Sequence, residues 1–462
     1  MSNQKIKNGS TGSPSRAESR EGINRRSFLR STAAVGMGLV FSPMVSGAAD
    51  DVKKADDIKV ALLGAGDQGQ VLIDACLKIP GLRFKAVCDI WTDYNQKKVS
   101  RRLKAYRHEN NTYLDYLEML DKEKDLDAVI IATPDFWHAE HSTACLKAGL
   151  HVYCEKEMSN TLEGARKIVQ AAKETGKLLQ IGHQRRSNPR YIHCYDKLLK
   201  EAKILGRITT INGQWNRAAR PDLGSPDKYP IDQATLEKYG FKSMHQFRNW
   251  RWYKGLGGGP IVDLGSHQID IYNWFLEANP KSVIAGGGTD YYDKETHQWY
   301  DNVMAIYEYE TSSGTVRAFY QTISTNSSQG YFESFMGDEG TLVISESAGR
   351  GAVYREPSAP DWDKWVKLGF VNEPIKKEEK PETGAVLDVR ETMAPPAYEL
   401  PVKMDKLYHQ PHLENFFDAI RGKAKLNCPA EIGYETAVTV LKVNEAVEAA
   451  RKLDFKPEEF KV

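Results

Sequence analysis

The chain of 462 residues carries 63 Lys and Arg against 62 Asp and Glu, which gives a net charge of +1. Residues 1–49 hold seven Lys/Arg and two Asp/Glu, so residues 50–462 carry a net charge of −4. This mild acidity gives no support for a nucleic-acid partner or for binding to an anionic membrane surface. The roughly 410 residues that follow the basic segment are sufficient for two domains with cores of their own.

The first 49 residues are expected to be an export signal rather than part of the fold. Asn24–Arg30 contains two adjacent arginines, and an apolar run of small residues follows at 33–45. With the small-residue cleavage region at 46–49, this pattern resembles a twin-arginine signal. The apolar run is shorter than the ~20 residues of a membrane span, and no cysteine for a lipid anchor lies near the cleavage region. We therefore expect a periplasmic or secreted protein without a membrane anchor.

A glycine-rich turn follows the first predicted strand, Val60–Leu63. The turn has the sequence Gly64-Ala65-Gly66-Asp67-Gln68-Gly69, and a helical apolar pattern follows it. A strand, a G-x-G-x-x-G turn and a helix together are the context of a dinucleotide-binding site. Here Gly64 allows the tight turn, Gly66 lets a pyrophosphate approach the backbone, and Gly69 lets the helix pack closely. The alternative is a tight turn that binds no ligand.

The second predicted strand, Arg83–Cys88, ends at Asp89, 20 residues after Gly69. A carboxylate at this distance accepts hydrogen bonds from a ribose diol and repels a 2′-phosphate. The sequence therefore favours NAD over NADP. The diphosphate would bind the unpaired N–H groups at the N-terminus of the first helix.

From residue 57 to about 184, predicted strands alternate with predicted helices, which indicates a parallel sheet covered on both faces. The ligand should lie outside the carboxyl ends of these strands, where Thr133, Pro134, Glu155 and Lys156 occur. The predicted strands are 60–63, 84–88, 128–131, 151–154 and 178–181, and the predicted helices are 68–79, 93–106, 113–121, 138–148 and 162–175.

After Gly206 the residues become typical of a mainly antiparallel sheet, with β-branched and aromatic runs between Gly, Ser and Asn turns. One helix is expected at 260–276, within this sheet region, and a charged, proline-rich segment at 373–401 is expected to be a long surface loop. The predicted strands are 208–215, 282–285, 302–310, 315–324 and 341–345, and two closing helices are predicted at 412–421 and 434–452.

The helix expected at 260–276 carries Asp263 and His267, which are four residues apart and so share one face. A carboxylate one turn from an imidazole can fix its tautomer and stabilise its protonated form. Such a pair on its own is more often ordinary surface chemistry. It becomes informative only together with the other motifs of the chain.

Four segments together resemble the glucose–fructose oxidoreductase / inositol dehydrogenase / rhizopine-catabolism (Gfo/Idh/MocA) family in sequence and spacing. They are GAGDQG, TPDFWHAEHSTACLKAGLHVYCEKE, GHQRRSNPRY and GGGPIVDLGSHQIDIYNWF, and the resemblance extends over residues 58–450. It implies an α/β plus α+β fold: an N-terminal Rossmann domain with a doubly wound parallel sheet, then an α/β domain with an open, mainly antiparallel sheet. It also implies a nicotinamide cofactor in the first domain and a sugar or polyol in the cleft.

The resemblance also assigns motif positions. The E-K-P motif of the family falls on Glu155-Lys156-Glu157, the D-x-x-x-H motif on Asp263 and His267, and G-x-x-x-R-x-x-P on Gly182, Arg186 and Pro189. Glu157 departs from the family's proline. A cis peptide before a residue other than proline costs ~2.5–4 kcal/mol, so a trans peptide and a re-aimed Lys156 are expected. A carboxylate beside Lys156 would also favour its charged form.

Oxidation of a secondary alcohol needs a hydride acceptor, a proton acceptor and a donor that stabilises the developing oxygen charge. We assign His267 as the general base, Asp263 as its orienting partner and Lys156 as the cationic donor. The cofactor would be held by residues of the glycine turn and of the strand ends. These are Gly64, Ala65, Gly66, Asp67, Gln68, Gly69, Asp89, Thr133, Pro134, His138, Glu155 and Gln184.

Segments that mix aromatic, amide and guanidinium groups occur at 215–217 and 246–253 and suit a carbohydrate, although each tryptophan alone fits a core equally well. Candidate substrate residues are His245, Trp250 and Arg251, with Arg186 from the family motif. No metal is expected, because the histidines lack metal-ligand spacing. The six cysteines show no C-x-x-C spacing and no pairing that the sequence defines.

The expected organisation is a signal at 1–49, a Rossmann domain at 50–184, a substrate and oligomerisation domain at 185–411, and C-terminal helices at 412–462. By resemblance, the open sheet would pair subunits of a homo-oligomer.

An exported enzyme must keep its NAD through turnover, which suits an oxidoreductase with a second substrate. The alternatives are a redox-neutral glycoside hydrolase or lyase that acts through a keto-sugar, and a non-catalytic sugar-binding protein. The D-x-x-x-H motif favours the oxidoreductase, because the family's glycosidases typically carry a different histidine motif.

Overall fold

The computed structural model describes residues 57–347, 349–375 and 395–462. The expected export signal at 1–49 lies outside this range, as does most of the segment expected to form a surface loop at 373–401. Within the range the fold contains two sheets, and most of their strands coincide with apolar or alternating runs in the sequence.

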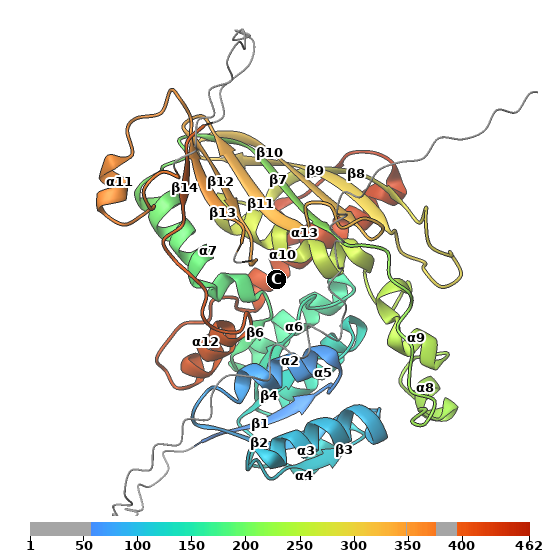
Figure 1. The fold of residues 1–462 in the computed structure, drawn as a ribbon. Helices are drawn as coiled ribbons and strands as arrows, with labels where there is room; N and C mark the ends of the chain where they lie inside the picture. Colours follow the sequence, from blue (N-terminus) through green and yellow to red (C-terminus); the bar gives the residue numbers. More distant parts are fainter. Residues whose placement is uncertain (1–56, 348, 376–394) are drawn as a thin grey trace, which may run out of the picture. The chain divides into compact units, whose positions relative to one another are not determined.

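The first sheet has six parallel strands in the order β3-β2-β1-β4-β5-β6 (Figure 1). This is the strand order of a dinucleotide-binding Rossmann domain, in which the order reverses between β1 and β4 and leaves a crevice at their carboxyl ends. The fold class expected from the sequence is confirmed. The strands are β1 (Ile58–Leu63), β2 (Leu82–Cys88), β3 (Asn111–Tyr113), β4 (Ala128–Ile131), β5 (His151–Cys154) and β6 (Leu179–Ile181).

Helices cover both faces of this sheet, because the strands are apolar on both sides and two separate buried clusters result. One prediction is wrong here: Tyr113 belongs to β3 rather than to a helix. The helix begins only after Asp115, whose carboxylate accepts a hydrogen bond from Leu117 N. The helices are α2 (Asp67–Cys76), α3 (Lys97–Ala105), α4 (Tyr116–Lys122), α5 (Asp135–Lys147) and α6 (Leu162–Thr175).

The second sheet has nine strands in the order β14-β13-β12-β11-β7-β10-β9-β8-β15, and only β7 and β10 pair in parallel. The segment at 373–401 is not wholly a loop, because its residues Ala397–Glu399 form β14 and pair with β13. The strands are β7 (Ile208–Asn216), β8 (Pro280–Gly288), β9 (Asn302–Thr311), β10 (Gly314–Ile323), β11 (Tyr331–Gly337), β12 (Gly340–Ile344), β13 (Gly351–Arg355), β14 and β15 (Leu453–Asp454).

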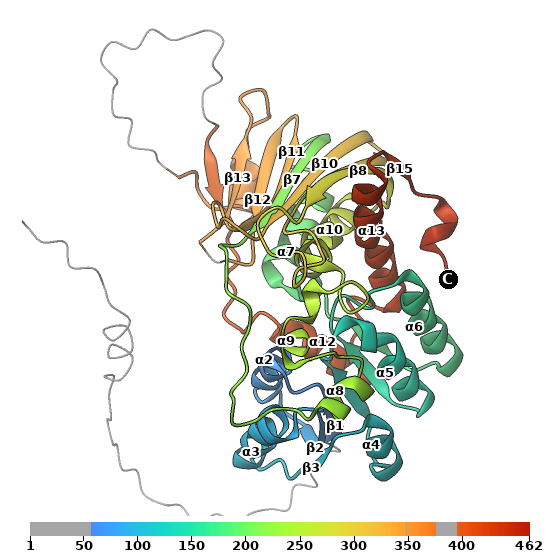
Figure 2. The ribbon, with the colours of Figure 1, turned by 90° about the vertical axis from the view of Figure 1, so that its right-hand side faces the viewer.

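Two long helices, α10 (Gly259–Leu276) and α13 (Ala430–Ala449), lie on one side of this sheet, as both ribbon views show (Figures 1 and 2). The aromatic side chains of the inner sheet face pack against α10, and Tyr272 donates a hydrogen bond to Phe319 O. The outer face leaves Ile284, Met304 and Ile306 more than 40% exposed. Helix α12 (Gln410–Ile420) instead joins the apolar cluster of the first sheet through Leu413, Phe416 and Phe417.

A buried ion pair fixes α10 against the end of the first sheet. Arg186, which follows β6, donates from Nε to both carboxylate oxygens of Asp270 on α10 at 2.9 Å. Thr436 on α13 donates to the same carboxylate at 2.9 Å. Because removing one partner of a buried pair leaves an uncompensated charge, this contact strongly constrains how α10 lies relative to the strand ends.

Residues 217–258, which we call the crossover arm, leave the second sheet and pack on the Rossmann domain. The arm contains α8 (Gln233–Lys238), α9 (Met244–Arg248) and a short 3₁₀ turn at Trp250–Trp252. Figures 1 and 2 show α8 and α9 beside the Rossmann helices. An apolar cluster joins the arm to that domain and includes Trp91, Ile231, Leu236, Tyr239, Phe241, Trp250, Tyr253 and Leu256.

Polar contacts hold the arm in the same place. The Trp91 indole N–H donates to Tyr229 O at 2.6 Å, and the Trp137 indole N–H donates to Tyr239 O at 3.2 Å. Indole groups that reach a backbone carbonyl fix both the ring and the segment that carries the carbonyl. The arm is therefore an ordered wall over the Rossmann domain.

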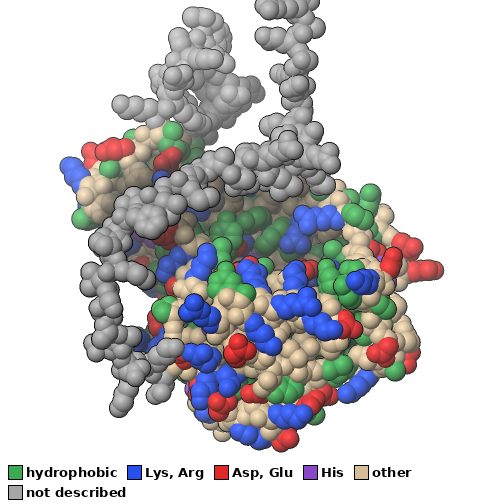
Figure 3. Space-filling model, turned by 60° about the horizontal axis from the view of Figure 1, so that its bottom comes forward, with side chains coloured by type: hydrophobic (Ala, Val, Ile, Leu, Met, Phe, Trp, Pro, Cys, Tyr) green, Lys and Arg blue, Asp and Glu red, His purple; other side chains and the backbone are tan. Residues whose placement is uncertain are grey.

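In the part of the chain that the structure describes, no helix has the length and apolarity needed to cross a bilayer. All six cysteines are buried free thiols. On the face seen in Figure 3, basic and acidic side chains are interspersed rather than gathered in one continuous patch.

Candidate active site

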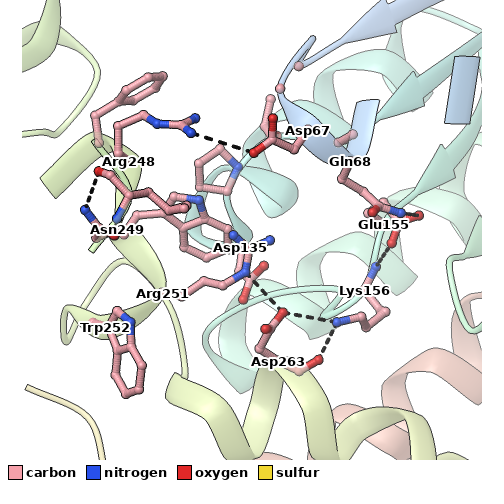
Figure 4. A pocket seen from close by; sticks show the side chains of 18 of the residues that line it. Asp67, Gln68, Asp135, Glu155, Lys156, Arg248, Asn249, Arg251, Trp252 and Asp263 are labelled. Carbon is pink, nitrogen blue, oxygen red and sulfur yellow. Dashed lines mark hydrogen bonds and ion pairs between the residues drawn. The ribbon is translucent and has the colours of Figure 1, made fainter. Parts of the chain in front are cut away.

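One cavity of about 610 Å³ brings most of the predicted site residues together. It lies at the carboxyl ends of β1, β4 and β5 and is closed by α10 and the crossover arm. The side chains in Figure 4 come from all of these elements and point toward one another. A cavity of this size at a topological switch point is the expected ligand site of such a sheet.

The glycine turn has the geometry of a phosphate cradle. Gly64 has φ +94°, and a Cβ there would lie 2.6 Å from Ala132 C. A Cβ at Gly69 would lie 2.1 Å from Gly64 O, so the helix packs directly on the turn. A Cβ at Gly66 would meet nothing closer than Asn95 Nδ2 at 3.9 Å, and Gly66 lines the cavity. The turn therefore has open space where a pyrophosphate approaches the N-terminus of α2, and it fits a dinucleotide.

Asp89 lines the same end of the cavity, after β2. Its Oδ2 accepts a hydrogen bond from Ala65 N at 2.6 Å, and its Oδ1 accepts one from Trp91 N at 2.7 Å. Burial raises the pKa of this carboxyl above its ordinary value, although the two backbone N–H groups act in the opposite direction. Asp89 thus shapes the glycine turn and keeps acceptor capacity toward the cavity.

Other predicted cofactor residues divide into cavity-lining and supporting positions. Asp67, Gln68, Thr133, Pro134, Glu155 and Gln184 line the cavity. His138 does not: its ring nitrogens lie 2.7 Å from the carbonyl oxygens of Glu157 and Thr133, so it supports two loops. Ala65 and Gly69 act through the backbone geometry of the turn rather than as lining residues.

Lys156, directly after β5 on the loop that leaves the sheet, reaches across the cavity to α10. Its ammonium group donates to the backbone carbonyl of Asp263 and lies 3.3 Å from Asp263 Oδ1. Arg251 of the crossover arm donates to the same oxygen at 3.1 Å (Figure 4). Burial alone would raise the pKa of Asp263, but Lys156 and Arg251 outweigh it and hold that pKa below its ordinary range.

His267 lines the cavity one turn further along α10. Its ring lies 5.5 Å from the Trp215 ring, and it is almost fully buried. Burial, together with the charges of Lys156 and Arg185, lowers the pKa of His267 well below its ordinary value. The imidazole is therefore neutral at physiological pH and able to accept a proton.

The expected hydrogen bond between Asp263 and His267 is not formed within the described residues. Asp263 instead pairs with Lys156 and Arg251, and His267 Nδ1 is a buried atom without a partner there. The spacing of four placed both residues on one helix face, as expected. It did not reveal that longer cationic side chains from other elements reach Asp263.

One expectation about Glu157 is wrong: the Lys156–Glu157 peptide is cis rather than trans. The Glu157 side chain is fully buried and accepts a hydrogen bond from Met158 N, so the carboxylate that neighbours the Lys156 ammonium is that of Asp263. Burial raises the pKa of Glu157 to about 8.

The candidate substrate residues are placed differently from one another. Trp250 and Arg251 line the cavity, and the Arg251 guanidinium stacks on the Trp250 ring at 4.3 Å. Arg186 is not a lining residue, because it is bound to Asp270. His245 is also outside the lining and contacts Asp222 and Tyr253.

Sequence reasoning missed Asp135, which directly follows Pro134 and lines the cavity. Burial raises its pKa to about 7. The motif T-P-D at 133–135, which directly follows a strand, could have identified this position. Reasoning also missed Tyr331 and Glu346 from the later strands, for which the sequence carries no motif.

Comparisons with known proteins agree with this geometry. Residues 58–183 match the family model of the oxidoreductase family with an NAD-binding Rossmann fold, and residues 197–343 match the GFO/IDH/MocA C-terminal domain. The chain belongs to the GFO/IDH/MocA oxidoreductase family. An NAD-binding Rossmann domain is thus a property of its family.

Among curated proteins, scyllo-inositol 2-dehydrogenase (NADP(+)) of Bacillus subtilis is 30% identical over 236 residues, which cover 50% of this chain and 55% of that protein. A glycosyl hydrolase family 109 protein of Shewanella putrefaciens is 28% identical over 175 residues, which cover 34% of this chain and 38% of that protein. The chain thus spans about half or less of the length of these relatives.

Among solved structures, aldose-aldose oxidoreductase from Caulobacter crescentus, complexed with glycerol, has a TM-score of 0.63 at 18% identity and shares the fold. That likeness covers 86% of this chain and 100% of the other.

Gly66→Val tests the cradle. A Cβ fits at this position, so the protein should fold, but the side chain occupies the space in which a phosphate approaches the backbone. We expect the dissociation constant of NAD to rise at least ~10-fold, measured by calorimetric titration of cofactor-free protein. Gly286→Val on β8 is the matched control, because a Cβ there meets nothing within 4 Å and Gly286 does not line the cavity. Equal NAD affinity in both variants would contradict the assignment of the turn.

Proposed function

We propose that this protein is an NAD-dependent oxidoreductase that acts on a secondary alcohol of a sugar or polyol. The observation that carries the proposal is a single cavity that joins the glycine turn at one end to Lys156, Asp263 and His267. When bound, NAD supplies the hydride acceptor for such a reaction. The protein's family and its sugar and inositol relatives support this substrate class.

We propose NAD rather than NADP as the cofactor. Asp89 lines the cavity near the turn, and both of its oxygens already accept backbone N–H groups. A 2′-phosphate placed beside this carboxylate would bring two negative groups together in a partly buried site. Ribose hydroxyls, in contrast, can donate to it.

In this proposal His267 takes the proton of the reacting hydroxyl. Its neutral ring suits that role, because a protonated imidazole has no acceptor nitrogen. Lys156 is held at the cavity wall by Asp263 and donates to the reacting oxygen as negative charge develops on it. Asp263 acts as the positioning residue for Lys156 rather than for His267.

A second candidate is a redox-neutral glycoside hydrolase or lyase that passes through a keto-sugar. The similarity to a glycosyl hydrolase family 109 protein supports it, and so does Asp135 in the cavity wall. Burial raises the Asp135 pKa to about 7, so near neutral pH a fraction of this carboxyl holds a proton that it can deliver to a leaving group. The third possibility, a non-catalytic sugar-binding protein, requires that Lys156 and His267 be dispensable.

We further propose that the protein is exported by the twin-arginine route with its cofactor already bound. The paired Arg25 and Arg26 and the apolar run after them support this route. The crossover arm supports retention of the cofactor, because it covers the Rossmann domain at the cavity. Arg248 of the arm lies 3.7 Å from Asp67 at the start of α2 (Figure 4).

The outer face of the second sheet is proposed to pair two or more subunits. Ile284, Met304 and Ile306 are 47%, 43% and 46% exposed on the adjacent strands β8 and β9. Apolar side chains grouped on one sheet face are typical of a protein contact surface.

Replacement of the two reacting groups tests the enzyme proposal. His267→Ala and Lys156→Ala should each lower kcat ~10²–10⁴-fold, because each removes a proton-transfer or charge-stabilising group. The NAD dissociation constant should change only a few-fold, which also shows that both variants fold. Steady-state kinetics on a sugar and polyol panel measures both effects, with Lys167→Ala on the exposed face of α6 as control. Full turnover in both variants would contradict the roles assigned to His267 and Lys156, whereas sugar binding without any turnover in the wild type would favour the non-catalytic protein.

Cofactor retention is tested on protein from the periplasmic fraction of an expressing bacterium. Denatured wild-type protein should release close to one NAD per chain, because the cofactor enters before export. A variant with Arg25→Lys and Arg26→Lys should stay in the cytoplasm. Exported protein without NAD would contradict retention.

Product masses from sugars and glycosides separate the two catalytic candidates. Loss of two hydrogens indicates oxidation, and release of an aglycone without net redox change indicates glycoside cleavage.

Subunit pairing is tested by sedimentation. The wild type should sediment as a homo-oligomer, and Ile306→Asp should shift it toward the monomer, because a charge would be buried at the sheet contact. Leu117→Asp on α4 is the control, since Leu117 is 57% exposed away from this sheet. A monomeric wild type would refute the proposal.

A further inference from the structure

The wall of the cavity formed by β7 carries a cation that the reaction described above does not use. Arg217 follows β7 directly and lines the cavity, where it is half-buried. The described residues offer it no ion pair and no side-chain hydrogen bond within contact distance. Burial lowers the pKa of its guanidinium, the charge of Asp263 acts in the opposite direction, and Arg220 and Arg251 lower that pKa further. This position thus carries a desolvated positive charge beside other cations.

The guanidinium is held in place by an aromatic support. Arg217 Cζ lies 5.1 Å from the centroid of the Trp215 ring, which in turn stacks on Tyr331 at 4.5 Å. A cation placed over an indole ring keeps its N–H groups directed outward at the edges of the plane. The planar fork of an arginine matches the two oxygens of a carboxylate.

Arg217 and His267 both lie close to the Trp215 ring. His267 lies 5.5 Å from the same indole ring, on the side of the cavity where Lys156 meets Asp263. One sugar ring is therefore long enough to place a hydroxyl at His267 and a substituent of another carbon at Arg217. The two positions suit opposite ends of one substrate.

The charge balance around Arg217 indicates that this substituent is anionic. Lys156, Arg251 and Arg217 all act on Asp263, but only Lys156 and Arg251 form ion pairs with it. Arg185 is also committed, to Glu333 and Glu346. Three cations thus face one carboxylate, and this excess of positive charge would be offset by an anionic substituent, for which the planar fork of Arg217 offers two parallel hydrogen bonds.

We propose that Arg217 forms a carboxylate subsite and that the substrate is a sugar acid, such as a hexuronic acid or a glycoside of one. This inference rests on the proposed function, since it names the substrate class of the same cavity. It assigns Arg217 a role in specificity, while Lys156 and His267 act on the reacting alcohol. Trp215 and Tyr331 are the positioning residues for the guanidinium.

The experiment compares uronic acids with their neutral parents on the full-length protein with NAD bound. Glucuronate and glucose, and galacturonate and galactose, are titrated by calorimetry and assayed by cofactor absorbance. In the wild type at least one uronate should bind ~10- to 100-fold more tightly than its neutral parent, with an affinity that falls as salt is raised. Arg217→Gln should abolish that difference while still binding the neutral sugar, which shows that the variant folds.

Two further variants make the result specific. Arg217→Lys should restore part of the preference, since it keeps the charge but not the fork. Arg317→Gln on β10, an exposed arginine of the same sheet outside the cavity, should have no effect. Glucose 6-phosphate should gain less than glucuronate.

The possible outcomes separate this inference from the proposed function. Turnover of neutral sugars without any uronate preference overturns the subsite and leaves the oxidoreductase proposal intact. Uronate binding that depends on Arg217 but gives no turnover supports the subsite and contradicts the enzyme. An equal gain for glucose 6-phosphate overturns the carboxylate assignment, and so does an unchanged preference in Arg217→Gln.

Discussion

The contact between Lys156 and Asp263 is the constraint on which the site depends. It joins the loop after β5 to the first half of α10, two segments 107 residues apart in sequence, and both side chains are at most one-fifth exposed. Removal of Asp263 from this pair would be costly, because the buried charge of Lys156 would then be left without a carboxylate. The contact therefore holds the helix of the second domain at the carboxyl ends of the first sheet. Arg186 and Asp270 form a second such connection about two turns further along α10.

The crossover arm forms the part of the cavity wall that the strand ends and α10 do not provide. The sheet and α10 leave the cavity open on the side of β2 and α5, and the arm closes that side with the aromatic cluster around Trp91 and Phe241. Because this contact is apolar, its burial stabilises the arm against the Rossmann domain. The result is a cavity whose nucleotide end and substrate end have walls from three separate parts of the chain.

A feature of the fold or the site could be predicted from the sequence when residues close together in the chain determine it. The glycine turn was predictable because strand, turn and helix are adjacent, and the face shared by Asp263 and His267 followed from their spacing of four. Strands β3, β13, β14 and β15 were missed because each has five residues or fewer, and β11, with seven residues, was missed as well. Of these, β14 and β15 pair with strands that are distant in the chain. The partners of Asp263 and the docking of the arm depend on long side chains that cross between elements. No periodicity in the sequence records such contacts.

The presence of two cations on Asp263 has a consequence for how Lys156 can act. If Lys156 were the sole partner, its movement toward a substrate oxygen would leave a buried carboxylate uncompensated. Arg251 removes this cost, because its Nε lies 3.1 Å from the same oxygen and keeps Asp263 paired. Asp263 in turn stays ionised, with a pKa below its ordinary range, so it continues to attract both cations. His267 is left neutral by its burial, to which the charge of Lys156 adds. The same ammonium group that can leave Asp263 for a substrate oxygen thus also helps to keep the imidazole able to accept a proton.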